Sequence, residues 1–316
     1  HTSHRDFIGK ELAPQPMKQM RARAAEIADD TIDEVIERGE CDFVWDIAGN
    51  MTSYMMADLL GMNRADAVDM YDAAEIVNSG ASYLDGIGLD AVQRLNGHAH
   101  TAWVERRENP RDDLLSRIAN GLLRGTPTDE SQFHLDFMNL VTAAGDTTRN
   151  VIAGGMAALF EHPEQLAIMA NGDADVIATA VEELLRWVSP VTNMRRTATV
   201  DTEIAGHPIR AGEKVASYYS IANRDPAQFR DPWTFTVHRS PNAHLAFGTG
   251  PHFCLGSHMS RVTLNAIFPK LFERMGDLEL VSPVDMTPAD PNSAPNVVGP
   301  KNMAVRFTPG PVRGAA

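Results

Sequence analysis

The sequence predicts a mainly helical protein with a smaller β portion. Apolar residues recur at helical spacing over most of the chain up to Val188. One of these stretches, 130–161, would make a helix on the order of 45 Å long, enough to cross a whole domain. After Arg196 the pattern changes to short runs separated by turn residues, which indicates small strands.

The helices expected before the long one follow from apolar periodicity and from the glycine and proline residues that end them. Their ranges are 16–38, 43–60, 64–77, 89–107 and 113–123. His98 and His100 are two residues apart, so they leave a helix on different sides. We expect both to be surface residues rather than ligands.

The long helix should end at His162-Pro163, because proline cannot continue it. The elements expected after it are a helix at 177–188, short strands at 197–204, 205–208, 209–212 and 214–218, an irregular meander at 223–244, a helix at 256–275, and a hairpin formed by 278–281 and 304–307. We expect residues 1–308 to form a single domain and residues 309–316 a flexible tail.

The composition narrows the class of protein. A net charge of −14 argues against nucleic acid and anionic membranes as partners. Cys41 and Cys254 are the only cysteines, which excludes a disulfide framework and favours a reducing, cytoplasmic location. No uncharged apolar run reaches membrane-spanning length. The chain begins at His1 without a methionine, so we expect an N-terminal segment to be missing.

The loop Phe247-Gly-Thr-Gly-Pro-His-Phe-Cys-Leu-Gly256 makes Cys254 a candidate metal ligand. Its glycines allow sharp turns and close approach to a flat group. The cysteine stands where a helix begins, and the helix dipole there favours thiolate over thiol. For a lone cysteine, a buried structural thiol is the simpler interpretation. Zinc is a poorer one, because His252 and Cys254 have no second ligand pair at a usual spacing.

The segment Ala143-Ala-Gly-Asp-Thr-Thr148 interrupts the long helix with residues that helices avoid. Threonine hydroxyls there can bond back to a carbonyl one turn earlier and bend the helix, which opens a groove for water or dioxygen. Taken alone, the segment also suits a helix–helix contact made of small residues. In the same way, Glu183 and Arg186 taken alone are an ordinary solvated i,i+3 pair.

Together these motifs resemble the cytochrome P-450 family. The Cys254 loop is similar to the family's haem-binding loop, and Ala143–Thr148 to its distal helix, except that Ala144 stands where glycine is usual. Glu183, Arg186 and Arg239 match its structural triad. The resemblance implies the family fold: a long central distal helix, a proximal cysteine loop and short β-sheets, here without the N-terminal part.

The resemblance also implies roles for individual residues. Cys254 would be the axial ligand of the iron of haem b, and Asp146 with Thr147 would deliver protons to dioxygen. The residues expected to contact the cofactor are His1, Arg5, Arg196, His252, Phe247, Gly248, Gly256 and Ala143. Four of these, His1, Arg5, Arg196 and His252, would meet the haem propionates, whose charges need cationic donors. The residues expected to line the substrate pocket are Ala143, Val191, Asn193, Met194, Val297 and Val298.

The implied activity is a haem-thiolate monooxygenase that hydroxylates a hydrophobic small molecule with O2. Its electrons would come from a ferredoxin and a ferredoxin reductase, with Lys10, Lys18 and Arg261 as weak candidates for a docking patch. The stretches 196–203 and 299–302 look most like the bacterial branch that oxidises terpene alcohols and steroids. The alternatives are a peroxide-driven haem oxygenase, which predicts loss of the acid–alcohol pair, and a non-catalytic haem-binding fragment.

Overall fold

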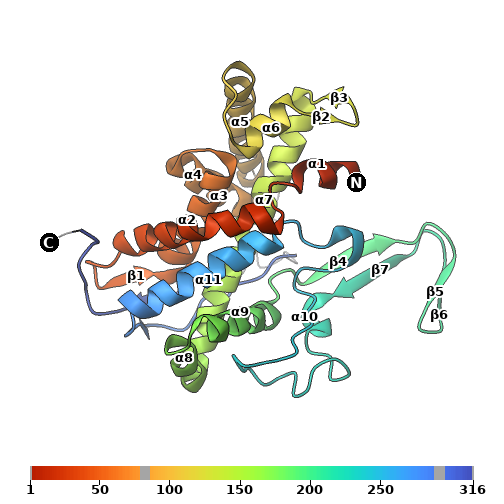
Figure 1. Cartoon of the computed structure of the whole chain (residues 1–316). Helices are drawn as coiled ribbons and strands as arrows, with labels where there is room; N and C mark the ends of the chain where they lie inside the picture. Colours follow the sequence, from red (N-terminus) through yellow and green to blue (C-terminus); the bar gives the residue numbers. More distant parts are fainter. Residues whose placement is uncertain (1, 79–85, 288–295, 315–316) are drawn as a thin grey trace.

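The computed structural model describes residues 2–78, 86–287 and 296–314. Figure 1 shows a helical body from which a thin pair of strands, β5 and β6, projects to one side. Helices dominate the described chain and the sheets are small, so the predicted fold class is confirmed. Within the described chain, no helix combines the length and the apolar character that crossing a membrane requires.

The helical segments follow one another along the chain from red to blue in Figure 1. They are α1 (Thr2–Ile8), α2 (Pro14–Asp33), the π-helical η1 (Phe43–Gly49), α3 (Asn50–Leu60), α4 (Arg64–Asn78), α5 (Ile87–Glu108), α6 (Leu114–Asn120), α7 (Glu130–Glu161), α8 (Pro163–Ala170), α9 (Ala174–Val188), α10 (Tyr219–Ala222), the 3-10 turn η2 (Gly250–His252) and α11 (Ser257–Arg274).

Helix α7 has the two ends that the sequence predicts. At its start the Asp129 side chain accepts a hydrogen bond from the backbone N–H of Gln132 (2.8 Å), which caps the helix. At its end Pro163 begins α8, a helix that was not predicted. Helix α7 runs through the body and contacts α3, α4, α5 and α9, so it is the element around which the others pack (Figure 1).

Helices α2 and α11 lie side by side across the front of the body (Figure 1). Ile27 of α2 and Phe268 of α11 are fully buried, as expected where two amphipathic helices share a core. Helix α11 also contacts α9 and, more lightly, α7. The residues that directly follow Cys254 are therefore held by the centre of the protein.

The strands form four small antiparallel sheets in the described chain. Their members are β1 (Glu40–Asp42) with β9 (Ala304–Arg306) and β8 (Glu279–Leu280), β2 (Leu122–Leu123) with β3 (Thr126–Pro127), β4 (Asn193–Thr197) with β7 (Lys214–Tyr218), and β5 (Thr202–Ile204) with β6 (His207–Ile209). The predicted terminal hairpin is present as β8 and β9.

The first sheet contains one strand that the sequence did not predict. In its centre Val305 of β9 faces both Cys41 of β1 and Leu280 of β8. The helix predicted at 16–38 stops at Asp33 and is followed by a turn, β1 begins at Glu40, and the helix predicted at 43–60 starts as the π-helical η1. This pairing joins residues 41 and 305, and no local pattern in the sequence reveals so distant a partner.

The C-terminal segment was expected to be a flexible tail, whereas its described residues contact α2. The backbone N–H of Gly310 donates to the carbonyl of Ile36 (3.0 Å). Arg313 donates from Nε to Asp33 (2.8 Å) and also pairs with Asp30. The contact is electrostatic, because the Arg313 guanidinium pairs with the carboxylates at the acidic end of α2.

Candidate active site

Two glycines shape the loop that precedes α11. Gly248 and Gly250 have φ angles of 67° and 68°, in the left-handed region that glycine adopts without strain. The loop closes through a hydrogen bond from the backbone N–H of Cys254 to the carbonyl of Phe247 (2.8 Å). The cysteine is thereby placed three residues before α11 begins at Ser257.

The surroundings of Cys254 combine partial burial of the sulfur with positive charge. The residue is exposed. Enough protein nevertheless surrounds its sulfur that burial raises the thiol pKa, while the backbone N–H of Gly256 and the charges of Arg5 and Arg261 act to lower this pKa. The sulfur of this exposed residue is thus under the influence of nearby positive charge. The fold brings Arg5 of α1 close enough to act on Cys254, although the two lie near opposite ends of the chain.

A hydrogen-bonded cluster behind the loop holds Phe247 in place. Arg261 lies over the Phe247 ring at 4.6 Å and donates to the Glu182 carboxylate through Nε (2.6 Å) and Nη2 (2.8 Å). His244 contacts the same carboxylate at 3.1 Å. Burial alone would raise the pKa of Glu182, but the hydrogen bonds from Arg261 and His244 lower it to about 2. Arg261 is therefore bound within this cluster. The sequence had suggested it as a weak candidate for a docking patch.

The structure brings Glu183, Arg186 and Arg239 together in the interior. Glu183 and Arg186 have no exposed surface. Arg186 binds both carboxylate oxygens of Glu183 (2.7 and 2.8 Å), and Arg239 adds bonds from its Nε (3.0 and 3.2 Å). Asn242, which the sequence did not single out, is a further donor to this carboxylate at 3.1 Å. An unexposed ion pair is stable only when its remaining groups are also bonded, and here they are.

The two arginines of this triad fasten the irregular segment that leads to the cysteine loop. Arg186 donates to the carbonyls of Asn223 (2.8 Å) and Pro232 (2.9 Å), and Arg239 to those of Arg230 (2.7 Å) and Thr234 (2.6 Å). The side chain of Asn223 then accepts from the backbone N–H of Leu245 (2.6 Å). The triad therefore positions the backbone only a few residues before Phe247.

The middle of α7 contains the predicted back-bonded threonine. Thr147 donates from Oγ1 to the carbonyl of Ala143 (3.2 Å), one turn earlier, and α7 continues through this point. Ala143 is exposed and Thr147 is half-buried, although both lie in the middle of the central helix. Residues four apart share a helix face, so the α7 surface at 143 and 147 borders open space.

Asp146, also on α7, is buried and belongs to a chain of charges. Its Oδ1 accepts from Nη2 of Arg149 (2.6 Å), which also approaches Glu75 (3.4 Å). Glu75 in turn accepts from Nζ of Lys301 (2.8 Å). Burial raises the pKa of Asp146, although Arg149 and Lys301 act in the opposite direction. Arg149, three residues after Asp146, could have been recognised from its spacing, whereas Glu75 and Lys301 could not.

One hydrogen bond connects the two halves of this region. Thr148, next to Thr147 on α7, donates from Oγ1 to Oγ of Ser260 on α11 (3.3 Å). Ser260 is six residues after Cys254, and its backbone N–H bonds to the carbonyl of Gly256 (2.9 Å). This bond connects α7 to the first turn of α11, the helix that follows the cysteine loop.

The segments predicted to line a substrate pocket lie together. Val191 and Val297 form an antiparallel bridge, and the N–H of Val298 donates to the carbonyl of Pro190 (2.9 Å). Asn193 uses its amide in a bond to Thr192 (3.0 Å), and Met194 is exposed (38%). Apart from Asn193 these residues have apolar side chains, which favours a hydrophobic ligand.

The basic residues predicted to meet a cofactor come from separate elements. Arg5 lies in α1, Arg196 in β4 and His252 in η2. Arg196 is exposed, donates only to the adjacent carbonyl of Arg195 (3.0 Å), and forms no ion pair with an acidic side chain within residues 2–78, 86–287 and 296–314. His1 lies outside the described residues.

The residues around Cys254 fit a haem. A methyl group added at Gly250 or Gly256 would meet no atom within 4 Å, so both glycines border open space. Ala143, on the central helix, is also exposed. The donor set is also suitable: one sulfur can bind iron, and basic side chains can neutralise two carboxylates.

Comparison with known proteins identifies one family. The sequence model of the cytochrome P-450 family matches residues 175–305, which contain the triad and the cysteine loop. A steroid C26-monooxygenase of Mycobacterium tuberculosis is 34% identical over 320 residues, which cover 99% of this chain and 85% of that protein. Cytochrome P-450-terp of a Pseudomonas species is 31% identical over 324 residues, 98% of this chain and 74% of that protein.

The fold agrees with that of a solved relative. Mycobacterium marinum cytochrome P-450 CYP268A2, determined in complex with pseudoionone, superimposes with a TM-score of 0.91 at 34% sequence identity. The alignment covers 97% of this chain and 75% of that chain.

Proposed function

The chain belongs to the cytochrome P-450 family of haem monooxygenases, and we propose that it hydroxylates a steroid, a terpenoid or a similar hydrophobic molecule, with electrons from a ferredoxin and its reductase. The observation that carries the proposal is the bond from Thr148 to Ser260 (3.3 Å), because it joins the helix that follows the cysteine loop to α7 beside Thr147. Relatives named for steroid oxidation and a structure bound to pseudoionone support the substrate class.

We propose that haem b is held by Cys254 through its sulfur and by Arg5, Arg196 and His252 at the propionates, with His1 as a fourth basic residue. Phe247, Gly248, Gly256 and Ala143 would contact its two faces. When bound, haem supplies the activation of O2, in which one oxygen atom enters a C–H bond and the other leaves as water, with two electrons and two protons consumed. The protein itself would supply protons and orient the substrate.

The first of these steps is proton supply, which we assign to Asp146 and Thr147. The Thr147 hydroxyl bonds weakly to the carbonyl of Ala143 (3.2 Å), so it can rotate and hold a water molecule beside the substrate. Burial raises the pKa of the Asp146 carboxyl, which favours uptake of a proton, although Arg149 and Lys301 act in the opposite direction. Arg149, Glu75 and Lys301 extend from Asp146 toward the surface and support a route for replacement protons.

The second step is orientation of the substrate. Val191, Met194, Val297 and Val298 would exclude water from the substrate, and the exposed Ala143 would set its closest approach to the cofactor. The polar group in this set is the amide of Asn193, which is already bonded to Thr192. A mainly apolar molecule with few polar groups is the ligand that such walls prefer.

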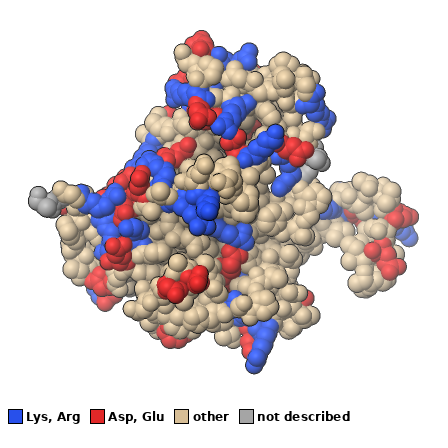
Figure 2. Space-filling model, in the orientation of Figure 1, with Lys and Arg blue, Asp and Glu red and all other residues tan. Residues whose placement is uncertain are grey.

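The electron donor would approach the face on which α2 and α11 lie. Figure 2 shows blue Lys and Arg atoms over this face, interspersed with acidic residues. Lys10 and Lys18 are exposed and can meet an acidic ferredoxin, whereas Arg261 is bound to Glu182. Two free cysteines and a dependence on reduced carriers support a cytoplasmic location.

The test is turnover by the purified chain with ferredoxin, reductase, NAD(P)H and a panel of steroids and terpenes. Thr147→Ala should lower the product formed per electron several-fold and release peroxide while haem uptake stays unchanged. Thr147→Ser keeps the hydroxyl and should retain coupling. Unchanged coupling in Thr147→Ala would remove Thr147 from proton delivery. Turnover only with peroxide, and none with reduced ferredoxin, would contradict the ferredoxin-dependent function, as would no turnover with any donor.

A further inference from the structure

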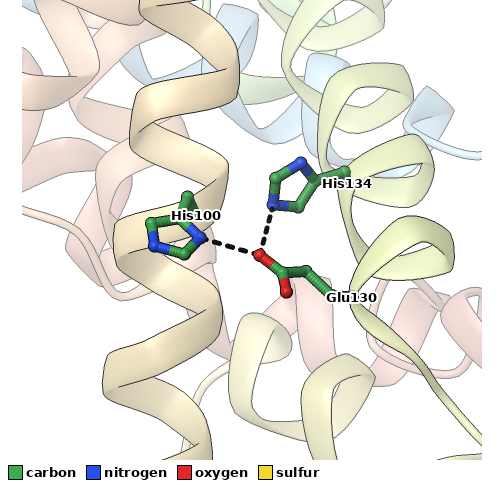
Figure 3. Close-up of side chains that lie close together, drawn as sticks. All are labelled: His100, Glu130 and His134. Carbon is green, nitrogen blue, oxygen red and sulfur yellow. Dashed lines mark hydrogen bonds and ion pairs between the residues drawn. The ribbon is translucent and has the colours of Figure 1, made fainter.

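A second group of chemically active side chains lies at the start of α7, away from the haem region. Figure 3 shows His100 of α5 beside Glu130 and His134 of α7, all three turned toward one another. His100 Nδ1 is 2.7 Å from Glu130 Oε1, and His134 Nε2 is 3.7 Å from the same oxygen. One potential ligand atom from each residue lies within 4.8 Å of the other two. His100, expected to be an isolated surface residue, is therefore part of a cluster.

Rigid elements hold this cluster. Glu130 and His134 are four residues apart on α7, so they share a helix face. The facing helix is fixed by a ring contact just below the cluster, in which Trp103 of α5 packs on Phe133 of α7 with centroids 5.4 Å apart. The positions of the three side chains are thus set by packing between α5 and α7.

The cluster leaves one nitrogen unsatisfied. His134 Nε2 is buried and makes no hydrogen bond to any described residue, because Glu130 at 3.7 Å is beyond hydrogen-bond distance. A buried polar atom without a partner is costly, and its presence calls for an explanation. This nitrogen points at the carboxylate that also binds His100, which is the direction a metal ligand would take (Figure 3).

We propose that His100, Glu130 and His134 bind a divalent transition-metal ion of the zinc class. Two imidazoles and one carboxylate are a common ligand set for zinc, with the fourth position left to water. Tetrahedral ligands about 2.0–2.1 Å from the ion are separated by about 3.3 Å. The observed separations of 2.7 and 3.7 Å lie on either side of this value, so small side-chain rotations complete the site.

The electrostatic surroundings contain both favourable and unfavourable parts. The N-terminus of α7 carries partial positive charge, which opposes a cation. Glu130 and the adjacent Asp129 supply negative charge at the same end. No Lys or Arg side chain forms an ion pair with Glu130 within the described ranges, so the carboxylate is available to a metal. Its only ion-pair partners there are the two proposed ligands.

The site would connect α5 to α7 at a distance from the haem. His134 and Asp146 are twelve residues apart on α7, which corresponds to about 18 Å along the helix. A metal here would fasten the start of the helix that carries Asp146 and Thr147. This inference does not depend on the proposed oxygenase function.

The experiment titrates the haem-loaded chain with Zn2+ alone by isothermal calorimetry. Wild type should bind one ion per chain at this site, and His134→Ala and Glu130→Gln should each weaken the affinity at least tenfold. The matched control is His98→Ala, because His98 is also on α5 but is paired with Asp69 at 2.7 Å. Its affinity should equal that of wild type. Cys41 should not compete with this site for Zn2+, since burial raises its thiol pKa to about 12.

Anomalous diffraction at the zinc edge then locates the ion. Density between His100, Glu130 and His134 supports the proposal. Three results overturn it: no binding by wild type, equal loss of affinity in His98→Ala, or an ion found elsewhere. Any of them would leave the three residues as a hydrogen-bonded surface cluster only.

Discussion

Glu182 and Glu183 are neighbours on α9 that serve different parts of the same loop. Glu183 is fully buried and binds Arg186 and Arg239, whose donors hold the segment before Phe247. Glu182 is partly exposed and binds Arg261, whose guanidinium covers the Phe247 ring. The proposed cofactor loop is therefore held from two sides by adjacent carboxylates.

The pKa of Glu182 predicts a pH dependence. Folding lowers this pKa from 4.5 to about 2, so the contribution of Glu182 to stability is full above pH 4.5 and is lost as pH falls toward 2. At neutral pH it amounts to at most about 3 kcal/mol. Glu182→Gln should lower the free energy of unfolding at pH 7, and its difference from wild type should shrink as the solution is acidified.

Circular dichroism during denaturant unfolding between pH 7 and 3 checks this prediction. Glu164→Gln is the matched control, because Glu164 is exposed on α8 and forms no ion pair among the described residues. A Glu182→Gln difference that does not vary with pH would show that the Arg261 and His244 bonds do not set the stability of this cluster.

Some single-residue features could be read from the sequence and others could not. The loop glycines, Cys254 and the back-bonded Thr147 follow from local chemistry, and the structure has the expected φ angles and threonine bond. The partners of Asp146 are different, because Glu75 and Lys301 reach it only through the packing of distant segments. His134 was missed for the same reason, since its partner His100 lies on another helix.

Among the elements, α7 was predicted best. Its ends carry strong local signals, an aspartate cap at Asp129 and a proline at 163, and both predicted ends agree with the structure. Strand β1 was missed because it is three residues long and, among the described strands, pairs with β9, which lies more than 250 residues away. Short strands depend on tertiary partners, and periodicity cannot detect them.

The contact between α7 and the segment beyond Val298 leads to a test at the level of elements. A Cβ added at Gly299 would lie 2.3 Å from Cγ of Asn150, so backbone or side chain must move. We expect Gly299→Ala to cost about 1–3 kcal/mol of unfolding free energy. It should also weaken binding of hydrophobic ligands, because Val297 and Val298 would shift with it.

The matched control for this substitution is Gly97→Ala. Gly97 is inside α5, and an added Cβ would meet nothing within 4 Å. Alanine is the better helix former, so this variant should gain up to about 1 kcal/mol. Chemical denaturation of both variants measures whether the free energy of unfolding falls in Gly299→Ala and rises in Gly97→Ala. Equal stability of Gly299→Ala and wild type would mean that the segment is not packed on Asn150 as described.

At the scale of the molecule, we propose that residues 1–308 form one haem-binding domain. Helix α7 contacts helices from both ends of the described chain, and β1 and β9 join residues near 41 to residues near 305. The last described residues belong to the same body, because Arg313 binds the acidic end of α2. Such long-range ties favour cooperative unfolding.

The terminal contact is tested by Arg313→Ala. Asp29, Asp30 and Asp33 would lose a shared cation, and we expect a loss of about 1 kcal/mol that decreases at high salt. Arg230→Ala is the control, because Arg230 is 96% exposed and its one ion pair is to the adjacent Asp231. Identical unfolding of wild type and Arg313→Ala would show that this contact does not hold the C-terminal segment on α2.

We propose that the sulfur of Cys254 holds the iron of a haem beside the exposed face of α7. The most direct measurement is the absorption spectrum of the purified chain, loaded with haem, reduced and exposed to carbon monoxide. We expect the red-shifted Soret band of a thiolate-bound haem in wild type and its absence in Cys254→Ser. A wild-type chain that takes up no haem, or whose band is that of a nitrogen-bound haem, would contradict it.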